Sequence, residues 1–510
     1  MNWKACILSL FSGILLFISF PSYDFHCFVW IALVPLLYAL RGRTLSESFR
    51  LGLLTGLVYN VGVLYWVSFV VVHYGFIPLY LGIAITILMA LCLGLYVSLF
   101  SVAVVYLRKR GIREIYAAPL LWTVLEFVKS YFLTGFPWEN LAYAQYSNAW
   151  LIQITDITGI YGITFVIVLA NCILFDMVTR RGKRLLVTEA VCGMIIAACI
   201  WGYGDYRIEQ VRKMVRDSTP VPVSLIQGNI DQSVKWDPQF QSSTLGIYRQ
   251  LSLTAAQSGP RLIVWPETAA PFYFQDIDER HRQVLAVARE AGAYLLFGSP
   301  SYVAVGERFF YRNSAYMVSP DGNITGRYDK THLVPFGEYV PLRRLLFFVQ
   351  KLVAGAGDFM PGEGTTPLVM DGRKIGVLIC YEGIFPEISA AYGRKGSTLL
   401  VNITNDAWYG RTSAPYQHLS MTALRAVENR LFLVRAANTG ISAIIDPAGA
   451  ITASTGLFER GVLNGNIRLM QCTTVYATYG DVFVYACMAL IVCISLFSIT
   501  RRNKHDRDYL

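Results

Sequence analysis

Long uncharged apolar runs are the feature that most constrains how this chain can fold. Only 15% of its 510 residues are charged, whereas charged residues make up about 25% of an ordinary soluble domain. The apolar runs gather in residues 1–203 and 482–500, and residues 204–481 have mixed polarity. A helix needs about 20 mainly apolar residues to cross a bilayer, where the backbone must satisfy its own hydrogen bonds. The pattern therefore predicts a membrane protein with one large polar domain.

The apolar runs predict eight spanning helices. Their ranges are 4–20, 25–40, 52–72, 77–107, 115–133, 156–178, 185–203 and 482–500. The chain is accordingly expected to comprise a seven-helix region (1–203), a large polar domain (204–481) and a C-terminal helix with its tail (482–510). The polar stretch 204–218 is expected to connect the seventh helix to the domain.

Positive charge alternates from one end of these helices to the other. The turns at 21–24, 73–76 and 134–155 contain no Lys or Arg. The opposite ends carry Lys4, Arg41, Arg43, Arg50, Arg108, Lys109, Arg110, Arg113, Arg180, Arg181, Lys183, Arg184, Arg501, Arg502, Lys504 and Arg507. Because Lys and Arg are retained on the cytoplasmic side, both termini are expected in the cytoplasm and residues 204–481 outside, in the periplasm if the cell is a Gram-negative bacterium. This topology accounts for the net charge of +10, and no nucleic-acid partner is expected.

Few polar groups interrupt the predicted spans. Glu126 and Lys129 lie three residues apart on one helix face, and a charged pair at this depth is a functional candidate. The alternative is that Lys129 only reaches to the outer interface. Most of the ten cysteines fall in apolar runs, where they behave as small hydrophobic residues. With no Cys/His ligand spacing, no metal and no cofactor is expected.

The polar domain alternates short β-rich runs with amphipathic helices, which predicts an α/β domain. The expected strands are 221–228, 261–266, 293–298, 313–318, 367–370, 374–380, 397–403, 432–437 and 441–446. The expected helices are 242–257, 279–291, 382–393 and 414–429.

Three apolar strand segments of this domain each lead into a reactive side chain: Glu267, Lys330 and Cys380. Any one of them alone is more often structural, but together they form a chemically complete set. A thiol must lose its proton to become a strong nucleophile. Glu267 can take that proton as general base. Lys330 can favour the thiolate and, with the backbone N–H of Tyr381, stabilise the oxyanion of an acyl-transfer intermediate.

The residues around this set resemble a known family. The order Glu, Lys, Cys and the run Asn438-Thr439-Gly440-Ile441-Ser442 resemble the nitrilase superfamily, whose fold is an αββα sandwich. Longer motifs resemble its membrane-bound branch, the bacterial apolipoprotein N-acyltransferases. These motifs are Tyr328-Asp329-Lys330-Thr331-His332-Leu333-Val334-Pro335-Phe336-Gly337-Glu338-Tyr339-Val340-Pro341, Ile379-Cys380-Tyr381-Glu382 and Thr134-Gly135-Phe136-Pro137-Trp138.

This resemblance implies a two-step acyl transfer. A phospholipid would give an acyl chain to Cys380 as a thioester, and the α-amine of a diacylglyceryl-cysteine at the N-terminus of an apolipoprotein would accept it, giving the mature triacylated lipoprotein. The family pattern also implies supporting roles for four residues: Glu338, Tyr381, Glu382 and Trp236. Each has a bland alternative: Glu338 can cap a turn, Glu382 can be a first-turn helix carboxylate, and Trp236 can pack at a turn rather than line a lipid entrance.

Residues 341–361 place Phe347 and Phe348 between basic residues, a pattern typical of a segment that touches lipid. We expect these two side chains to bind substrate and gate acyl-chain entry, with a buried helix as the alternative. His332 and His418 raise a rival catalytic pair of the cysteine–histidine type. At the level of function, the alternatives are a membrane-tethered amidase or nitrilase-type hydrolase and a non-enzymatic scaffold or transporter.

Overall fold

The computed structural model describes residues 2–179, 182–341 and 359–507, and the chain divides into two compact units. Unit 1 comprises residues 1–68, 78–206 and 481–510, and unit 2 comprises 69–77 and 207–480.

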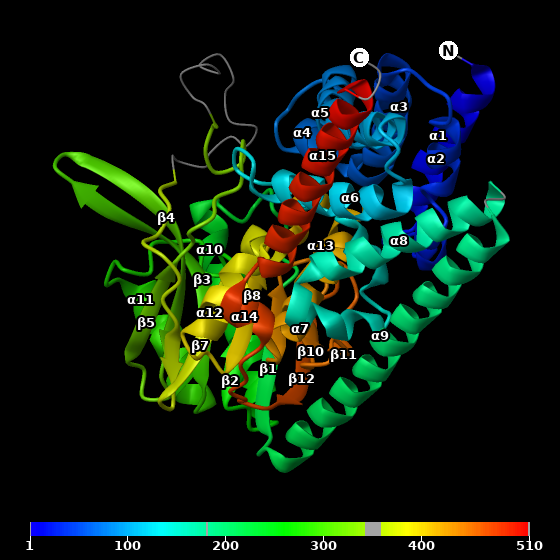
Figure 1. Ribbon diagram of the computed structural model, residues 1–510. Helices are drawn as coiled ribbons and strands as arrows, with labels where there is room; N and C mark the ends of the chain where they lie inside the picture. The colour runs from blue at the N-terminus through cyan, green and yellow to red at the C-terminus, as the bar shows by residue number, and fades with distance from the viewer. Residues whose placement is uncertain (1, 180–181, 342–358, 508–510) are drawn as a thin grey trace. The chain divides into compact units, whose positions relative to one another are not determined.

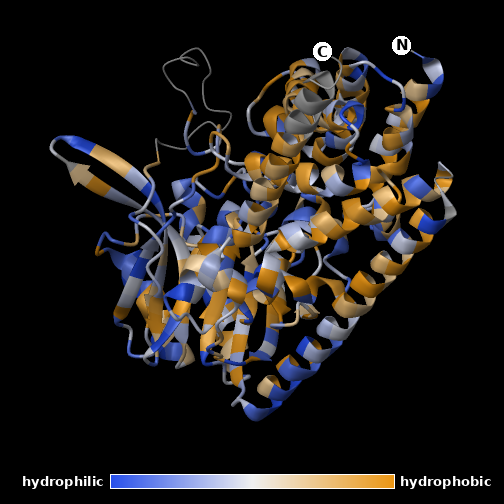
Figure 2. Ribbon diagram, viewed as in Figure 1, coloured by the Kyte–Doolittle hydropathy of each residue, from blue (hydrophilic) through white to orange (hydrophobic). Residues whose placement is uncertain are grey.

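Unit 1 is helical and largely apolar (Figures 1 and 2). Its elements are α1 (Trp3–Ile18), η1 (His26–Trp30), α2 (Val34–Ala39), α3 (Leu45–Leu64), α5 (Leu79–Lys109), α6 (Glu114–Tyr131), η2 (Leu141–Gln145), η3 (Leu151–Ile154), α7 (Thr155–Thr158), α8 (Ile160–Val178), α9 (Lys183–Asp217) and α15 (Val482–Arg507). The last residues of α9 already belong to unit 2. The short helix α4 (Trp66–His73) likewise passes from unit 1 into unit 2.

Small residues let the helices of unit 1 approach closely. A Cβ atom added to Gly56 of α3 would lie 2.6 Å from the Cα of Gly94 in α5, so these backbones touch where no side chain intervenes. Such contacts between small residues are typical of helices packed within a membrane.

Among the described residues, three helices are long and apolar enough to cross a membrane: α5, α8 and residues Arg184–Asp217 of α9. A fourth span is added if α3 and α4, bent by 53° at their junction, are counted as one. The apolar helices Trp3–Ile18, His26–Ala39 and Val482–Phe497 are shorter. The chain therefore contains several membrane-compatible helices, and the number of eight spans stays a prediction.

Helix α9 extends through most of the polar stretch 204–218, which was expected to connect the seventh helix to the domain. It continues without a break to Asp217, although its side chains change from hydrophobic to hydrophilic toward this end (Figure 2). Residues 205–216 include many Arg, Glu, Gln, Lys and Met, which favour helix even when no apolar face is buried. The helix ends shortly before Pro220, since the residue preceding a proline disfavours helical backbone.

Glu126 is buried in unit 1 and is fully engaged. Its carboxylate accepts hydrogen bonds from Trp122 Nε1 (3.0 Å), the Leu141 backbone N–H (2.8 Å) and Thr164 Oγ1 (2.7 Å). Lys129 instead donates to the carbonyl oxygen of Trp138 at 3.2 Å. Glu126 thus joins α6 to η2 and α8, which gives it a structural role.

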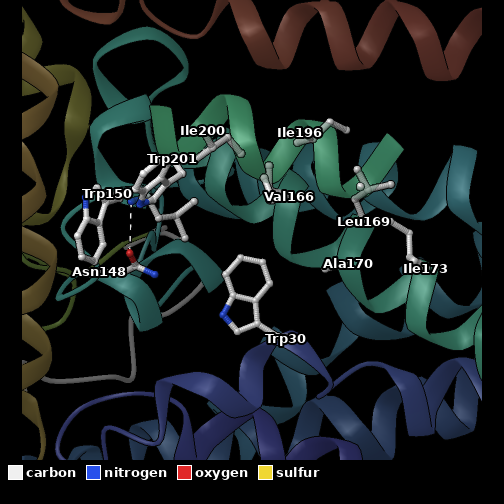
Figure 3. Close-up of a pocket in the computed structure, with 13 residues that line it drawn as sticks. Trp30, Asn148, Trp150, Val166, Leu169, Ala170, Ile173, Ile196, Ile200 and Trp201 are labelled. Atoms are coloured by element: carbon white, nitrogen blue, oxygen red, sulfur yellow. Dashed lines mark hydrogen bonds between the residues drawn. The ribbon is translucent and has the colours of Figure 1, made fainter. Parts of the chain in front are cut away.

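A cleft of about 360 Å³ opens in unit 1 between α8 and α9. Its walls are mainly aliphatic, and Figure 3 shows Trp150 and Trp201 near Asn148 at one end, with Trp30 apart from them. The cleft belongs to the helical unit, whereas Glu267, Lys330 and Cys380 belong to unit 2.

Unit 2 contains two mixed six-stranded sheets (Figure 1). The first has the order β12-β1-β2-β3-β4-β5, and the second has the order β11-β10-β9-β8-β7-β6. The strands are β1 (Val221–Gln227), β2 (Leu262–Val264), β3 (Tyr294–Val305), β4 (Arg308–Val318), β5 (Ile324–Asp329), β6 (Leu368–Met370), β7 (Arg373–Ile379), β8 (Leu399–Thr404), β9 (Leu433–Ala437), β10 (Ala443–Ile445), β11 (Ile451–Ser454) and β12 (Gly461–Ile467).

Helices pack against each sheet. The core of the first sheet includes side chains of α10 (Pro238–Ala256) and α11 (Glu279–Ala291). Next to the second sheet, α12 (Pro386–Arg394) contacts β7 and α13 (Ala414–Asn429) contacts β9. The remaining elements are η4 (Cys380–Ile384), η5 (Asp406–Tyr409) and α14 (Val475–Tyr479). Strands β1, β2 and β3 are mutually parallel, as are β7, β8 and β9. The carboxyl ends of β2 and β7, which precede Glu267 and Cys380, therefore lie at the same edge of their sheets as the carboxyl ends of the neighbouring parallel strands.

Candidate active site

The three predicted reactive residues directly follow strand ends in unit 2. Glu267 lies three residues after β2, Lys330 follows β5, and Cys380 follows β7. All three are buried, with 7%, 1% and 7% of their surface exposed, respectively. The strand residues that lead to Glu267 and Cys380 are apolar and buried, whereas β5, which leads to Lys330, is more polar and mainly exposed or half-buried.

Glu267 is held at both ends of its carboxylate. Its Oε1 accepts a hydrogen bond from Asn313 Nδ2 at 2.7 Å, and its Oε2 accepts one from the Asn405 backbone N–H at 2.9 Å. The Nζ of Lys330 lies 3.9 Å from Oε1. The carboxylate is therefore fixed in orientation while remaining beside a buried cation.

The backbone of Glu267 is also fixed. Lys235 is buried and donates from Nζ to the Glu267 carbonyl oxygen at 3.1 Å. Burial lowers the pKa of Lys235 to about 8, although the nearby charges of Glu267 and Cys380 oppose that shift. On the other side, a Cβ atom at Gly298 would lie 2.4 Å from the Thr268 backbone nitrogen, so only glycine lets β3 approach this loop.

Lys330 remains charged in this buried place. Its Nζ forms an ion pair with Glu338 Oε1 at 2.9 Å, and the other oxygen of Glu338 accepts the Val334 backbone N–H at 2.7 Å. Burial disfavours the ammonium, but Glu338 and Glu267 outweigh burial and raise the pKa of Lys330 above its ordinary value. Glu338 thus orients Lys330, as predicted, and also caps the backbone turn at Val334, which was the alternative role.

Cys380 occupies a sharp turn between β7 and η4. Its φ of 53° is unusual for a residue other than glycine and is often a feature of functional sites. Burial and the charge of Glu267 raise the pKa of its thiol above the ordinary value, while Lys330 and a hydrogen bond with Thr404 act in the opposite direction. Lys330 therefore acts in the expected direction, toward the thiolate, but burial and Glu267 oppose it.

Glu382 ties the Lys330 loop to the Cys380 turn. Its Oε1 accepts from Tyr328 Oη (2.7 Å), the Thr331 backbone N–H (2.7 Å), Thr331 Oγ1 (2.9 Å) and the His332 backbone N–H (3.2 Å). Its Oε2 accepts the Ile379 backbone N–H at 2.8 Å. Five donors from two loops make Glu382 much more than a first-turn helix carboxylate.

The other predicted side chains divide into three groups. Tyr381 is buried, and its ring packs against Phe385 at 5.0 Å between ring centroids. Trp236 is 48% exposed, one residue beyond the buried Lys235. Phe347 and Phe348 lie outside the described residues, so their predicted contact with lipid stays a prediction.

The two histidines do not favour a cysteine–histidine pair. The ring of His332 packs on Phe385, with 3.8 Å between centroids. His418 Nε2 lies 3.2 Å from the backbone carbonyl oxygen of Cys380, where it can hold the main chain. Glu267 therefore remains the better candidate for the base.

Sequence reasoning missed Asn313, Asn405 and Lys235. Asn313 is at the site because β4 pairs with β5 in a register that places Ser314 opposite Asp329, and Lys330 extends that ladder through its N–H to the Asn313 carbonyl (2.8 Å). Only strand pairing reveals this proximity. Lys235 had a weak signal, a cation beside the already selected Trp236.

The arrangement is suited to acyl transfer. A fixed carboxylate can take a proton from a thiol, and a permanently charged ammonium can stabilise an oxyanion. Within the ranges that the structure describes, no group of three or more His, Cys, Asp or Glu side chains is placed to hold a metal ion.

Comparison with known proteins covers nearly the whole chain. Residues 222–477 match the carbon-nitrogen hydrolase family, and residues 12–173 match the family described as the apolipoprotein N-acyltransferase N-terminal domain. The chain is 47% identical to the apolipoprotein N-acyltransferase of Geobacter metallireducens, over 98% of this chain and 96% of that protein. It is 33% identical to the apolipoprotein N-acyltransferase of Methylococcus capsulatus, over 98% and 97%. Among solved structures, an amidase from Nesterenkonia sp. AN1 is 22% identical over 53% of this chain and 98% of its own, with a TM-score of 0.40.

Proposed function

Because the chain belongs to the apolipoprotein N-acyltransferase family, we propose that it N-acylates lipoproteins through a thioester on Cys380, with Glu267 as general base and Lys330 as the stabiliser of the oxyanion. The enzyme is an acyltransferase of lipoprotein biosynthesis, with a phospholipid as donor and a lipoprotein as acceptor. The observation that carries the assignment of residues is the convergence of Glu267, Lys330 and Cys380 from three strand ends, with both charges acting on the Cys380 thiol.

In the first half-reaction, Cys380 Sγ attacks the ester carbonyl carbon of the phospholipid while Glu267 takes the thiol proton. Lys330 and the Tyr381 N–H stabilise the tetrahedral oxyanion. The carbon–oxygen bond then breaks, and Glu267 returns the proton to the leaving lysophospholipid oxygen. The acyl chain is left on Cys380 as a thioester.

In the second half-reaction, the α-amine of the diacylglyceryl-cysteine attacks the thioester carbonyl. Glu267 takes a proton from that amine, the carbon–sulfur bond breaks, and the same proton returns to sulfur. The products are an amide and the free thiol, so the enzyme is regenerated without a cofactor.

A membrane setting fits two lipid substrates. We propose eight spans with both termini in the cytoplasm of a bacterial inner membrane, and a periplasmic catalytic domain whose two sheets form an αββα sandwich. The distribution of Lys and Arg and the apolar helices of unit 1 support this topology. If the reaction takes place at the outer face of the bilayer, neither the phospholipid nor the diacylated lipoprotein has to leave the membrane completely.

Product analysis separates transfer from the amidase-type alternative. Purified enzyme is incubated with phospholipid carrying one isotopically labelled acyl chain and with a diacylated lipopeptide. We expect labelled triacylated lipopeptide and lysophospholipid in equal amounts, and their loss in Cys380→Ala but not in the matched variant Cys472→Ala. Labelled free fatty acid as the main product would instead identify a hydrolase.

A further inference from the structure

A buried polar network contacts the turn at Cys380 through the carbonyl oxygen of that residue, an atom to which the proposed chemistry gives no role. It consists of Asn402 on β8, Asp406 on η5, His418 on α13 and Arg435 on β9. All four residues are at most 1% exposed. Burying this many polar and charged groups is costly unless every group is paired, so the network needs an explanation.

The network converges on one backbone atom, the carbonyl oxygen of Cys380. His418 Nε2 lies 3.2 Å from this oxygen, and Asn402 Nδ2 lies 3.4 Å from it. Asn402 Nδ2 also donates to the Leu378 carbonyl oxygen at 2.9 Å. Two side chains from different elements therefore hold the peptide that joins Cys380 to Tyr381.

Arg435 fixes both of these side chains. Its Nη1 donates to Asn402 Oδ1. Its Nη2 lies 2.7 Å from Asp406 Oδ2 and 3.1 Å from His418 Nδ1. Asp406 Oδ1 in turn lies 3.0 Å from His418 Nδ1. One guanidinium thus sets the orientation of the amide and the imidazole together.

The charges of the network keep this arrangement stable. Burial would raise the pKa of the Asp406 carboxyl, but Arg435 and His418 hold it well below its ordinary value. Burial and Arg435 lower the pKa of His418, against the influence of Asp406. A carbonyl oxygen can only accept, so His418 must carry a proton on Nε2 to bond the Cys380 carbonyl, while its Nδ1 lies between Arg435 Nη2 at 3.1 Å and Asp406 Oδ1 at 3.0 Å.

The geometry of a trans peptide connects this network to the reaction. In a trans peptide the C=O and N–H groups point in opposite directions. With the Cys380 carbonyl directed at His418 and Asn402, the Tyr381 N–H is directed away from them. That N–H is the backbone donor assigned to the oxyanion.

We propose that His418, supported by Arg435 and Asp406, is a positioning residue that aims the Tyr381 N–H at the oxyanion by anchoring the Cys380 carbonyl. This inference rests on the proposed role of Cys380 as the acyl-accepting nucleophile. It adds a function for side chains that touch neither the substrate nor the thiol proton.

The test compares two reactions of the same sulfur atom. Acylation of Cys380 by p-nitrophenyl butyrate, followed as the burst of p-nitrophenol, passes through an oxyanion. Alkylation by iodoacetamide, followed by intact mass, does not. Loss of one oxyanion donor typically slows acyl transfer by about 100- to 1,000-fold. We expect His418→Ala to slow acylation by about 100-fold or more and to change alkylation by less than about threefold, with much of the acylation rate restored in His418→Gln, whose amide can donate to the same carbonyl.

Ser420→Ala is the matched control, because Ser420 is buried in the same helix and its hydroxyl donates only within that helix, to the Gln417 carbonyl oxygen at 2.8 Å. It should leave both rates unchanged. Equal losses of acylation and alkylation in His418→Ala, or acylation at the wild-type rate, would overturn the proposal. The small ester separates this proposal from the proposed function. If the wild-type enzyme failed to accept an acyl chain from phospholipid, the proposed function would be refuted, but the ratio of the acylation rate to the alkylation rate in His418→Ala would still test the role of His418.

Discussion

Replacing Glu267 with glutamine should nearly eliminate acyl transfer and at the same time make the Cys380 thiol easier to ionise. General-base catalysis contributes about 10²- to 10⁴-fold to a rate, so thioester formation from phospholipid should fall by that factor. The negative charge of Glu267 raises the pKa of the thiol, so its removal lowers that pKa. The pH dependence of iodoacetamide alkylation should therefore shift to lower pH in Glu267→Gln.

Opposite signs for the two effects distinguish a lost base from a damaged site. Glutamine keeps the length of the side chain, and its oxygen can still accept from Asn313 Nδ2, which also donates to Glu338 Oε1 at 3.1 Å; its NH₂ group then replaces the oxygen that accepts the Asn405 N–H. Glu279→Gln, which changes a carboxylate with 67% side-chain exposure, should behave as wild type. A variant at Glu267 that keeps more than about a tenth of the rate, or whose alkylation shifts to higher pH, would contradict the assigned role.

Replacing Glu382 with alanine should cost both stability and activity. The buried carboxylate accepts from five donors, on residues 328–332 and on Ile379, and leaving a buried donor unsatisfied typically costs about 1–3 kcal/mol. The same change frees the Lys330 loop from the Cys380 turn, and a displacement of about 1 Å at reacting groups can cost about 100-fold in rate. We expect the variant to unfold at a clearly lower temperature in detergent and to lose turnover by about 100-fold or more.

The exposed carboxylate Glu363 provides the comparison for this variant. Its side chain is 90% exposed and lies 3.7 Å from Arg312, so Glu363→Ala should change neither the unfolding temperature nor turnover. Wild-type turnover in Glu382→Ala would show that the two loops keep their positions without this carboxylate, against the role inferred for it.

Local patterns in the sequence were sufficient to predict most of the catalytic domain. Short continuous apolar runs located β7 and β8 to within two residues, and the predicted helical run 414–429 coincides with α13. The strands β11 and β12 were missed because both are partly exposed: β11 has only four residues, and Gly and Asn interrupt the aliphatic residues of β12. The end of α9 was missed because a polar helix has no apolar stripe to reveal it.

The site was predictable where a reactive residue follows a strand segment. Cys380 and Glu267 follow buried apolar strands and Lys330 follows the more polar strand β5, whereas Asn313 owes its position to strand register and Arg435 owes its partners to the packing of α13 on the second sheet. Such contacts join residues that are distant in sequence and carry no local pattern. They become visible only when the strands and helices have been placed in three dimensions.

The central claim is that Cys380 carries the acyl chain between donor and acceptor. Intact-mass measurement of the purified enzyme after incubation with phospholipid tests it most directly. The account predicts one added acyl mass that hydroxylamine removes, that is absent from Cys380→Ala, and that disappears when diacylated lipopeptide is added. An acyl mass that persists in Cys380→Ala, or triacylated product formed by that variant at the wild-type rate, would contradict it.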